Sequence, residues 1–326
     1  MGDELLTCEQ LLADYKVGKK HLNEVRHWFP IRPTPELAGL AAALISDGHI
    51  DWNNYDGNPR PKKLILYSND PQECEWFLGT VWRLFCVRGE VVKYCSNSGY
   101  SANSSYKAVV YCAVLARILI LLGVPAGDKT TSPFAVPKWV LGGSREIKKE
   151  FLRVLFNFDG SLSMRTRRET AIEMNYSMNK HEAIVSNGQQ FLLQVKELLS
   201  DFGVTAGRIH VRPCAGDKYT ILLFVTNHLS ILNFHENIGF LGETKRRKLE
   251  TAVSIITKHR RTSGGSDVLR LLKEKVGSDR AAISRINKLS QVKCSLRQFE
   301  HMRRGESLIP VDMVNAALKI LNEKTG

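Results

Sequence analysis

Leu40-Ala-Ala-Ala-Leu-Ile-Ser-Asp47-Gly48 and Leu152-Arg-Val-Leu-Phe-Asn-Phe-Asp159-Gly160 are two stretches of the sequence that end in the same way. Each is an apolar run of helical character that stops at Asp-Gly. Glycine is common just after a helix because it accepts the left-handed backbone conformation. One such stretch by itself indicates only the end of a helix, so the residues that follow each stretch decide what the pair means.

The predicted elements after the two Asp-Gly pairs follow one order of strands and helices. The first half has the strand Lys62–Ser68, the helix Trp76–Phe85, the strands Glu90–Tyr94 and Tyr106–Cys112, and a helix that ends at Gly123. The second half has the strand region Ser161–Ser177, the helix Phe191–Phe202, the strands Arg208–Arg212 and Tyr219–Val225, and a helix that ends at Gly239. This repetition predicts two units related by a pseudo-twofold axis, a symmetry that matches a DNA duplex.

A lysine lies six residues beyond each of these last glycines. Lys129 follows Asp47 by 82 residues, and Lys245 follows Asp159 by 86, although Arg246, Arg247 and Lys248 adjoin Lys245. Two carboxylates brought together at helix ends repel each other unless cations separate them. Carboxylate and carbonyl oxygens suit Mg²⁺, and metal ions that bridge attacking and leaving oxygens support phosphodiester hydrolysis. A lysine beside each metal could polarise the scissile phosphate.

The charge and the cysteines restrict the partners and the compartment. The 326 residues include 46 Lys and Arg against 33 Asp and Glu, a net charge of +13, which favours a polyanionic partner. The seven cysteines are scattered without a CxxC pair, so neither a zinc site nor a disulfide framework is indicated, and an intracellular location is expected. The longest apolar stretch, Val109–Pro125, carries Arg117 and is too short to span a membrane. It is predicted to be a strand that runs into a buried helix.

Composition and proline positions predict four parts of the chain. They are a helical extension over 1–35, a first repeat over 36–135, a second repeat over 136–261, and a helical tail over 267–326. The stretch Thr262–Ser266 between the last two is rich in glycine and serine, which predicts a flexible linker.

The two motif stretches resemble the paired motifs of the LAGLIDADG homing endonucleases, over about residues 36–255. Four other segments add to the resemblance: Leu122–Lys129, Val136–Val140, Ile147–Arg153 and Ile238–Phe240. The resemblance implies an α+β fold of tandem pseudo-twofold αββαββα repeats that meet along the motif helices and present antiparallel saddle sheets to DNA. It also implies Mg²⁺-dependent cutting of both strands of a long asymmetric site, with Mn²⁺ as a possible substitute.

The same resemblance assigns roles to six residues. Asp47 and Asp159 match the metal-binding acids. Gly48 and Gly160 match the positions just after them and are expected to bind the metal through their carbonyl oxygens. Lys129 and Lys245 match the basic residues. The sequence departs from the family at the third motif position, which is usually glycine and is here Ala42 or Val154. Helix separation depends on the side chains at the contact, so Val154 is expected to push the helices apart or shift their register.

The saddle strands should present alternate residues to DNA. Arginine suits guanine edges, whereas lysine more often meets phosphate. The alternative is the solvated outer face of a sheet. The residues predicted to contact DNA are His49, Arg60, Lys62, Lys93 and Lys107 in the first half, and Ser161, Ser163, Arg165, Arg167, Arg208, His210 and Arg212 in the second.

The tail is predicted to form four helices, Val268–Val276, Arg280–Lys288, Leu296–Arg304 and Val311–Asn322. The segment from Ser295 to Gly305, followed by Pro310 and an apolar helix, resembles the end of a phage-repressor-type helix-turn-helix. This weaker resemblance places Arg285, Arg297 and Arg303 near a major groove. The alternative is a small helical bundle that only packs on the core.

The main hypothesis is therefore a monomeric, site-specific endonuclease of double-stranded DNA. The chain begins Met-Gly and lacks a terminal His-Asn, so a free-standing enzyme is expected rather than a complete intein, although an endonuclease trimmed from an intein stays open. One alternative is a non-cleaving DNA-binding regulator that resembles a degenerate LAGLIDADG core with a helix-turn-helix. Such regulators tend to lack the two acids that this chain keeps. Another is an intron RNA maturase, because a basic surface serves RNA as well as DNA.

Overall fold

The protein is described here from a computed structural model that covers residues 4–55, 58–94, 105–164, 172–259, 261–262 and 264–323. Internal contacts divide the chain into two compact units. The first consists of Met1–Ser163 with Glu173–Leu249, and the second of Met164–Ile172 with Glu250–Gly326. The first predicted repeat belongs to the first unit, and so does the second apart from residues 164–172 and 250–261.

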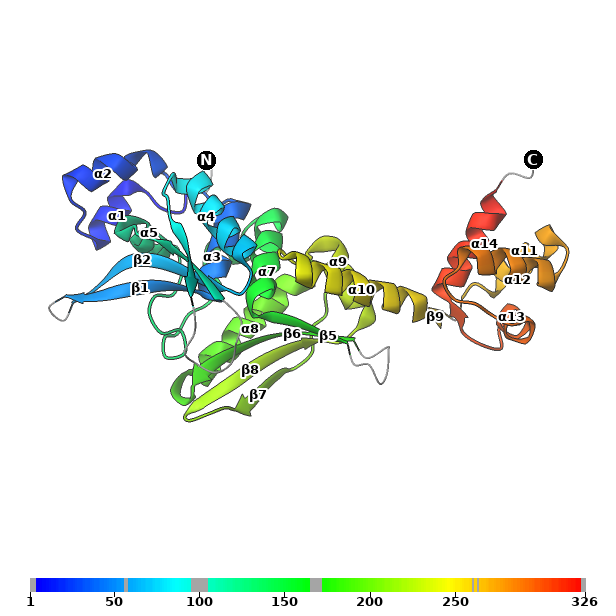
Figure 1. Cartoon of the computed structure of the whole chain (residues 1–326). Helices are drawn as coiled ribbons and strands as arrows, with labels where there is room; N and C mark the ends of the chain where they lie inside the picture. The colour runs from blue at the N-terminus through cyan, green and yellow to red at the C-terminus, as the bar shows by residue number, and fades with distance from the viewer. Residues whose placement is uncertain are drawn as a thin grey trace. The chain divides into compact units, whose positions relative to one another are not determined.

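The first unit contains the same series of elements twice (Figure 1). The first series is α3 (Pro35–Ile45), β1 (Gly48–Tyr55), β2 (Asn58–Ser68), α4 (Pro71–Phe85), β3 (Glu90–Tyr94), β4 (Ser105–Val110) and α5 (Ala113–Leu121). The second is α7 (Arg145–Asp159), β5 (Gly160–Met164), β6 (Ile172–His181), α8 (Val185–Ser200), β7 (Ile209–Pro213), β8 (Lys218–Val225) and α9 (His228–Asn237). The predicted αββαββα repeats are thus confirmed.

The two sheets have one topology. Their strand orders are β1-β2-β4-β3 and β5-β6-β8-β7. The pairs whose register is described are antiparallel, and β1 and β2 change register by a bulge between Asp51 and Trp52. One face of each sheet lies against the helices, as the buried Leu64 and Leu66 on β2 and the buried Ile221 and Leu223 on β8 show. The opposite, open face of the second sheet carries the exposed side chains of His210 and Arg212 on β7.

The helices α3 and α7 pack against each other along their length. Thr34 caps the start of α3 and Ser144 the start of α7, because each side chain accepts a bond from a backbone N–H of the first turn. Ala38 and Leu40 on α3 are fully buried, as are Leu152 and Val154 on α7. The first unit therefore has its centre where these two helices meet.

Val154 does not push the helices apart as the sequence analysis expects. The reason is Gly39 on α3, where an added Cβ would lie 3.3 Å from Val154 Cγ2 and 3.3 Å from Glu150 Cγ. The valine side chain takes the space that a Cβ at position 39 would need. The contact thus stays close although neither motif has glycine at its third position.

The left-handed backbone conformation expected for the two motif glycines is absent. Neither Gly48 nor Gly160 has a positive φ, and Gly160 is extended, at φ −84° and ψ 151°. The strand begins at the glycine itself and passes close over the last turn of its own helix. A Cβ on Gly48 would lie 2.6 Å from Leu44 Cα, and one on Gly160 would lie 2.3 Å from the Phe156 carbonyl oxygen. Glycine is required here by close backbone approach, not by left-handed geometry.

The N-terminal extension contains α1 (Cys8–Asp14), α2 (Lys19–Val25) and a short 3₁₀ turn, η1 (Arg26–Trp28). Arg117 on α5 explains how the extension is held, because its guanidinium donates to the Lys16 carbonyl at 3.0 Å and lies 5.3 Å from the centre of the Tyr15 ring. Arg117, the charged residue in the longest apolar stretch, thus binds the N-terminal extension. That stretch is β4 followed by α5, as predicted. Between the repeats, α6 (Lys138–Leu141) forms a single turn.

The second unit is a helical bundle of α11 (Ser266–Val276), α12 (Asp279–Leu289), α13 (Leu296–Arg303) and α14 (Val311–Asn322). The four predicted tail helices are thus present. The expected linker differs, because Arg261–Thr262 forms β9 and pairs with β10 (Ile309–Pro310). The helix α10 (Glu243–His259) runs from the first unit into the second. Within the part of the chain that the structure describes, no helix is both long and apolar enough to cross a membrane.

Candidate active site

Asp47 and Asp159 lie at the ends of the two packed motif helices. Asp159 is the last residue of α7, whereas Asp47 follows the last residue of α3 by two positions. The two carboxylates are close enough that the charge of Asp47 raises the pKa of Asp159. The sequence prediction that the fold brings these residues together is therefore met by the geometry, while their catalytic role stays a prediction.

Both carboxylates have raised pKa values, mainly because the surrounding protein desolvates them. Desolvation and then the charge of Asp47 raise the pKa of Asp159 to about 7, although Lys129 and a hydrogen bond from Tyr176 act in the opposite direction. The pKa of Asp47 is raised as well, with Lys129 and Lys245 opposing desolvation. Asp47 nonetheless has an exposed side that opens to solvent. The pair is thus protonated more readily than ordinary aspartates.

Lys129 lies on the carbonyl end of α3. Its Nζ donates to the carbonyl oxygens of Leu44 at 3.3 Å, Ile45 at 3.0 Å, Ser46, and Gly48 at 2.8 Å. The carbonyls of Leu44 and Ile45 are among those that the last turn of a helix leaves without partners, whereas Gly48 begins β1. The ammonium group satisfies them and lies next to the Asp47 carboxylate, so Lys129 joins the end of the first motif helix to its own loop.

Lys245 repeats this arrangement on α7. Its Nζ donates to the carbonyl oxygens of Asn157, of Phe158 at 3.4 Å and of Gly160 at 2.6 Å. Of four consecutive basic residues, Lys245 is thus the one that occupies the position equivalent to Lys129. Desolvation lowers the pKa of both lysines. Each glycine carbonyl predicted to bind metal already accepts a lysine bond through one of its two lone pairs.

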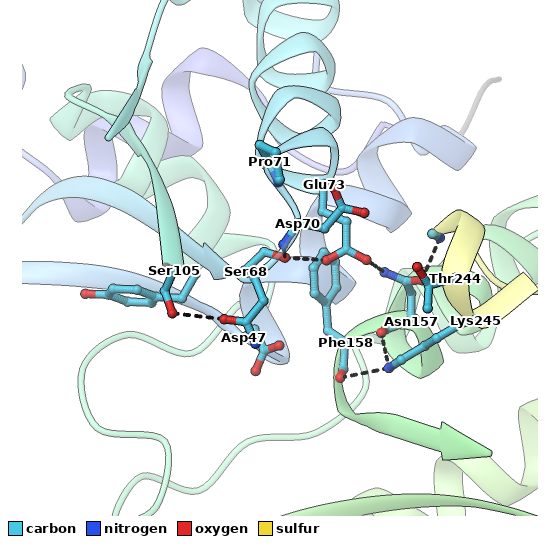
Figure 2. Close-up of a pocket in the computed structure, with 13 residues that line it drawn as sticks. Asp47, Ser68, Asp70, Pro71, Glu73, Ser105, Asn157, Phe158, Thr244 and Lys245 are labelled. Carbon is cyan, nitrogen blue, oxygen red and sulfur yellow. Dashed lines mark hydrogen bonds between the residues drawn. The ribbon is translucent and has the colours of Figure 1, made fainter. Parts of the chain in front are cut away.

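A pocket of about 960 Å³ opens beside Asp47 (Figure 2). Its lining includes Glu73 from the first turn of α4, Asn157 from α7, and Lys245. Glu73 accepts from Ser68 Oγ at 2.5 Å and from Asn157 Nδ2 at 2.7 Å, and Asn157 Oδ1 accepts from the Gly242 N–H at 2.7 Å. This chain of bonds links the first repeat to the second motif helix and to Gly242, just before α10, the helix that carries Lys245.

Sequence reasoning missed four residues around the site: Glu73, Asn157, Tyr176 and Lys180. Tyr176 is fully buried on β6, and its hydroxyl donates to Asp159 Oδ2 at 3.1 Å. Asn157 did carry a signal, because it is a polar residue inside an apolar helical run two positions before the acid. The other three reach the site from strands or helices whose local sequence shows no special spacing.

The acid pair fits a magnesium ion better than a metal that needs many protein ligands. Among the described residues, no group of three or more His, Cys, Asp or Glu side chains is arranged to hold a metal. Mg²⁺ commonly keeps several waters and takes only one or two carboxylates together with substrate phosphates. The mutual repulsion that raises the pKa of Asp159 would be relieved by a cation at this point.

The open face of the second sheet carries several predicted DNA contacts. His210 pairs with Leu222 and Arg212 with Thr220, so the four side chains share the face opposite the buried Ile221 and Leu223. His210 and Arg212 are exposed. Ser161 Oγ lies 3.2 Å from Asn175 Oδ1, Ser163 alternates with the buried Leu162, and Arg208 is exposed just before β7. Arg165 and Arg167 lie outside the described residues.

The open face of the first sheet carries His49 and Lys107. His49 pairs with Ile65, and Tyr67 on the same face pairs with Lys107. Arg60 pairs with Asn53 and is exposed, while Lys62 is exposed at the bulge. This face also holds Lys63, which the sequence analysis did not select and which pairs with Asp51 at 3.0 Å.

Two predicted DNA contacts need correction. Lys93 pairs with Tyr106, whereas its neighbour Val92 pairs with Lys107, so Lys93 points to the opposite face of the first sheet from Lys107. In the second unit, the Arg303 guanidinium is half-buried and pairs with Asp279 at 3.1 Å. Its charge is used inside the bundle. Arg285 and Arg297 are exposed, as a DNA contact requires.

Comparison with protein families gives a match over residues 146–239, which contain most of the second repeat, to the LAGLIDADG-like domain. The second repeat is a LAGLIDADG-like domain. The first repeat of this LAGLIDADG fold has the same order of elements and the same strand order, as described above.

Curated relatives contain segments similar to this chain. A tRNA-splicing ligase RtcB of Methanocaldococcus jannaschii is 30% identical over 261 residues, and the DNA-directed RNA polymerase subunit Rpo1N of the same organism is 28% identical over 223 residues. The alignments cover 75% and 66% of this chain but only 26% and 16% of the two relatives. The chain thus spans 26% or less of the length of these proteins.

Solved structures with a similar arrangement include the homing endonuclease I-WcaI bound to its DNA recognition sequence. It is 11% identical, with a TM-score of 0.47, and the match covers 74% of this chain and 97% of that chain. Full-length DUF199/WhiA from Thermatoga maritima is 15% identical, with a TM-score of 0.43, and the match covers 95% of this chain and 88% of that chain.

Proposed function

We propose that this chain is a site-specific endonuclease of double-stranded DNA that uses a divalent metal ion, Mg²⁺ or Mn²⁺. The observation that carries the proposal is the junction of the two motif helices. There, the charge of Asp47 raises the pKa of Asp159, and each helix end holds its own lysine. Two equivalent acid and lysine sets, one from each repeat, suit a substrate with two equivalent strands.

Each residue of this site has a definable task. The carboxylates of Asp47 and Asp159 would hold the metal, which supplies charge neutralisation of the scissile phosphate and a lowered pKa of water. Lys129 and Lys245 occupy the free carbonyls of the helix ends and so direct the remaining oxygens inward. Tyr176 fixes the orientation of Asp159 through its hydroxyl. A monomer suffices, because one chain supplies both halves.

The DNA would lie on the open faces of the two sheets. His210 and Arg212 on the second sheet and His49 and Lys107 on the first are placed to contact it. The net charge of +13 agrees with this partner, because neutralised phosphates release condensed counterions. Polar residues such as Asn175 and Asn179 lie between these contacts on β6 and could read base edges.

The distribution of the relatives supports a mobile element. Similar segments occur in a tRNA-splicing ligase and in an RNA polymerase subunit, two proteins with different named functions, and form 26% or less of each. A segment shared by such different proteins does not perform the reaction of either. We infer that the chain derives from an element that inserts into genes, such as an intron or an intein, and that it cuts the uninterrupted copy.

The experiment is cleavage of a supercoiled plasmid that carries the uninterrupted host-gene junction. Linear product is expected with Mg²⁺ and not with EDTA. Asp47→Asn and Asp159→Asn are expected to abolish cutting while they retain DNA binding. Asp201→Asn is the matched control, because Asp201 pairs with Lys148 on the surface of the same unit. Cutting by either site variant at the wild-type rate would contradict the assignment.

A second candidate is a DNA-binding regulator, favoured by the C-terminal helical unit. There α12 and α13 are consecutive helices joined by a turn, and the carboxylate of Asp312 holds that turn through Ser290 Oγ at 2.6 Å and the Gln291 N–H at 2.6 Å. The exposed Arg297 on α13 and Arg285 on α12 would then contact DNA. Tight duplex binding without cleavage in Mg²⁺ or Mn²⁺ would favour this reading. Restored splicing of a host intron by Asp47→Asn would instead indicate a maturase.

A further inference from the structure

Lys180 is a buried lysine that the proposed chemistry does not use. It lies near the end of β6 in the second repeat, and its side chain has no exposure to solvent. Its Nζ donates to the carbonyl oxygens of Lys129 at 2.8 Å and Ser132 at 2.8 Å. The same ammonium group lies 3.8 Å from the centre of the Phe134 ring. Both hydrogen bonds thus go to the segment that carries Lys129.

That segment is fastened to β6 at several points. The backbone N–H of His181, next to Lys180, donates to the Thr130 carbonyl at 2.8 Å. Within the segment, Asp128 accepts from the N–H of Thr130 through its side chain, and from the N–H groups of Thr131 and Ser132 through its carbonyl. The turn is therefore closed internally and attached to the other repeat by two neighbouring residues. The position of the Lys129 side chain follows from this attachment.

Packing alone does not explain a lysine at this position. Desolvation lowers the pKa of Lys180 to about 8, so the protein bears a cost to keep the charge buried. An apolar side chain of the same length would fill the space without that cost. The neighbouring helix even leaves room for it, since a Cβ on Gly188 would lie 2.9 Å from Lys180 Cγ. The charge is retained for its bonds to the carbonyl oxygens.

The two repeats differ here. Val110 and Val225 end the equivalent strands β4 and β8, and each lies three residues before the next helix. Leu64 pairs with Val110 and Met174 pairs with Val225, so Leu64 and Met174 are equivalent positions. Asp70 and Lys180 each lie six residues further along the chain and therefore correspond. Asp70 caps the start of α4 instead. Lys245 lies instead in the first turn of α10, and Gly242 just before this helix donates to Asn157. The attachment by Lys180 therefore serves only one of the two lysines.

We propose that Lys180 is a positioning residue for Lys129, and that it supports one half of the double-strand break. Its removal should release the turn over residues 128–132 and misplace the Lys129 ammonium, while the Lys245 half remains intact. This inference rests on the proposed endonuclease function. If only one half of the site is active, only one DNA strand is cut and the product is nicked. The rates at which the two strands are cut therefore measure the two halves of the site separately.

The test uses the full chain with Lys180→Met, and Lys196→Met as the control. Lys196 also donates to a carbonyl in this repeat, that of Gly207 at 3.1 Å, but it lies on α8 away from the site. Conversion of supercoiled plasmid to nicked circle should persist in Lys180→Met. The second cut to linear DNA should slow by about 10- to 100-fold, the size of effect that a misplacement of about 1 Å can have. DNA affinity should stay near the wild-type value.

Equal slowing of both cuts, or no slowing of either, would overturn the proposal. If Lys180→Met does not fold, Gly188→Ala takes its place, because its added methyl group would lie 2.2 Å from Ile221 Cδ1 and 2.9 Å from Lys180 Cγ and so crowds the Lys180 side chain without removing the charge. The same excess of nicked product is then expected, and an unchanged ratio of nicked to linear DNA would contradict the proposal.

Hydrogen exchange separates this inference from the proposed function. The amides of Thr131 and Ser132 should exchange faster in Lys180→Met than in the wild type, whether or not the wild type cuts DNA. A wild type that never cuts refutes the endonuclease, whereas unchanged exchange over residues 128–132 refutes the role of Lys180.

Discussion

Val154 on α7 packs against Gly39 on α3, and this contact decides how closely the two motif helices approach. An added Cβ at Gly39 would lie 3.3 Å from Val154 Cγ2, so the valine occupies the space left by the glycine. The acids at the helix ends are near enough that the charge of Asp47 raises the pKa of Asp159. The geometry of the acid pair thus depends on two residues in the middle of the helices, away from the acids themselves.

Gly39→Val should destabilise the first unit and slow cleavage, because two branched side chains cannot share the space at this crossing. Overpacked cores typically lose about 1–3 kcal/mol. Urea unfolding measures the loss. The double variant Gly39→Val with Val154→Ala moves the branched side chain from α7 to α3 and should recover part of the lost unfolding free energy. Strictly additive effects in this cycle would show that the two residues are not coupled.

Gly48→Ala and Gly160→Ala should each lower stability and abolish cutting, because the added Cβ meets backbone atoms at 2.6 Å and 2.3 Å. Backbone cannot move aside without opening the end of the motif helix, and a loss of about 2–3 kcal/mol is expected. The control is Gly18→Ala, where a Cβ meets nothing within 4 Å. Thermal unfolding and plasmid cleavage read out both effects, and a Gly160→Ala enzyme of normal activity would refute the explanation.

The stability of the metal-free protein should fall as the pH rises from about 4 to 7. The pKa of Asp159 is raised from 3.8 to about 7, so within this window the folded state holds a proton that the unfolded state has lost. The unfolding free energy then decreases with pH, at most by about 1.4 kcal/mol per pH unit for one group. Urea unfolding in EDTA at pH 5 and pH 7 measures the slope.

Asp159→Asn provides the control for this pH dependence, since it removes the titrating group and should flatten the slope. Mg²⁺ should stabilise the wild type more at pH 7 than at pH 5, because it competes with the proton for the same carboxylates. A wild-type slope equal to that of Asp159→Asn would contradict the raised pKa.

Arg297→Ala and Arg303→Ala should act on different properties of the C-terminal unit. Arg297 is exposed on α13, so its loss should weaken DNA binding and reduce the salt dependence by about one phosphate contact, without a change in stability. Arg303 pairs with Asp279 inside the bundle, so its loss should cost stability. Binding at several salt concentrations together with thermal unfolding distinguishes the two. If Arg297→Ala leaves binding unchanged, the helical unit does not contact DNA through α13.

The sequence by itself determined the repeat, its order of helices and strands, and the acids and lysines that recur at matching spacing. It also determined the four tail helices, because periodicity and caps such as Ser295 before α13 are local signals. These features can be recognised without knowledge of any contact. Asp47, Asp159, Lys129 and Lys245 therefore could be selected before the fold was described.

Only the tertiary structure decided how the two halves fit and what surrounds the acids. Three interactions join residues far apart in the chain: Gly39 with Val154, Tyr176 with Asp159, and Lys180 with the backbone of Lys129. No local sequence pattern indicates these interactions. The motif glycines show the same limit. Their identity was plain, but the reason for it, a strand passing within contact distance of its own helix, is a property of three-dimensional packing.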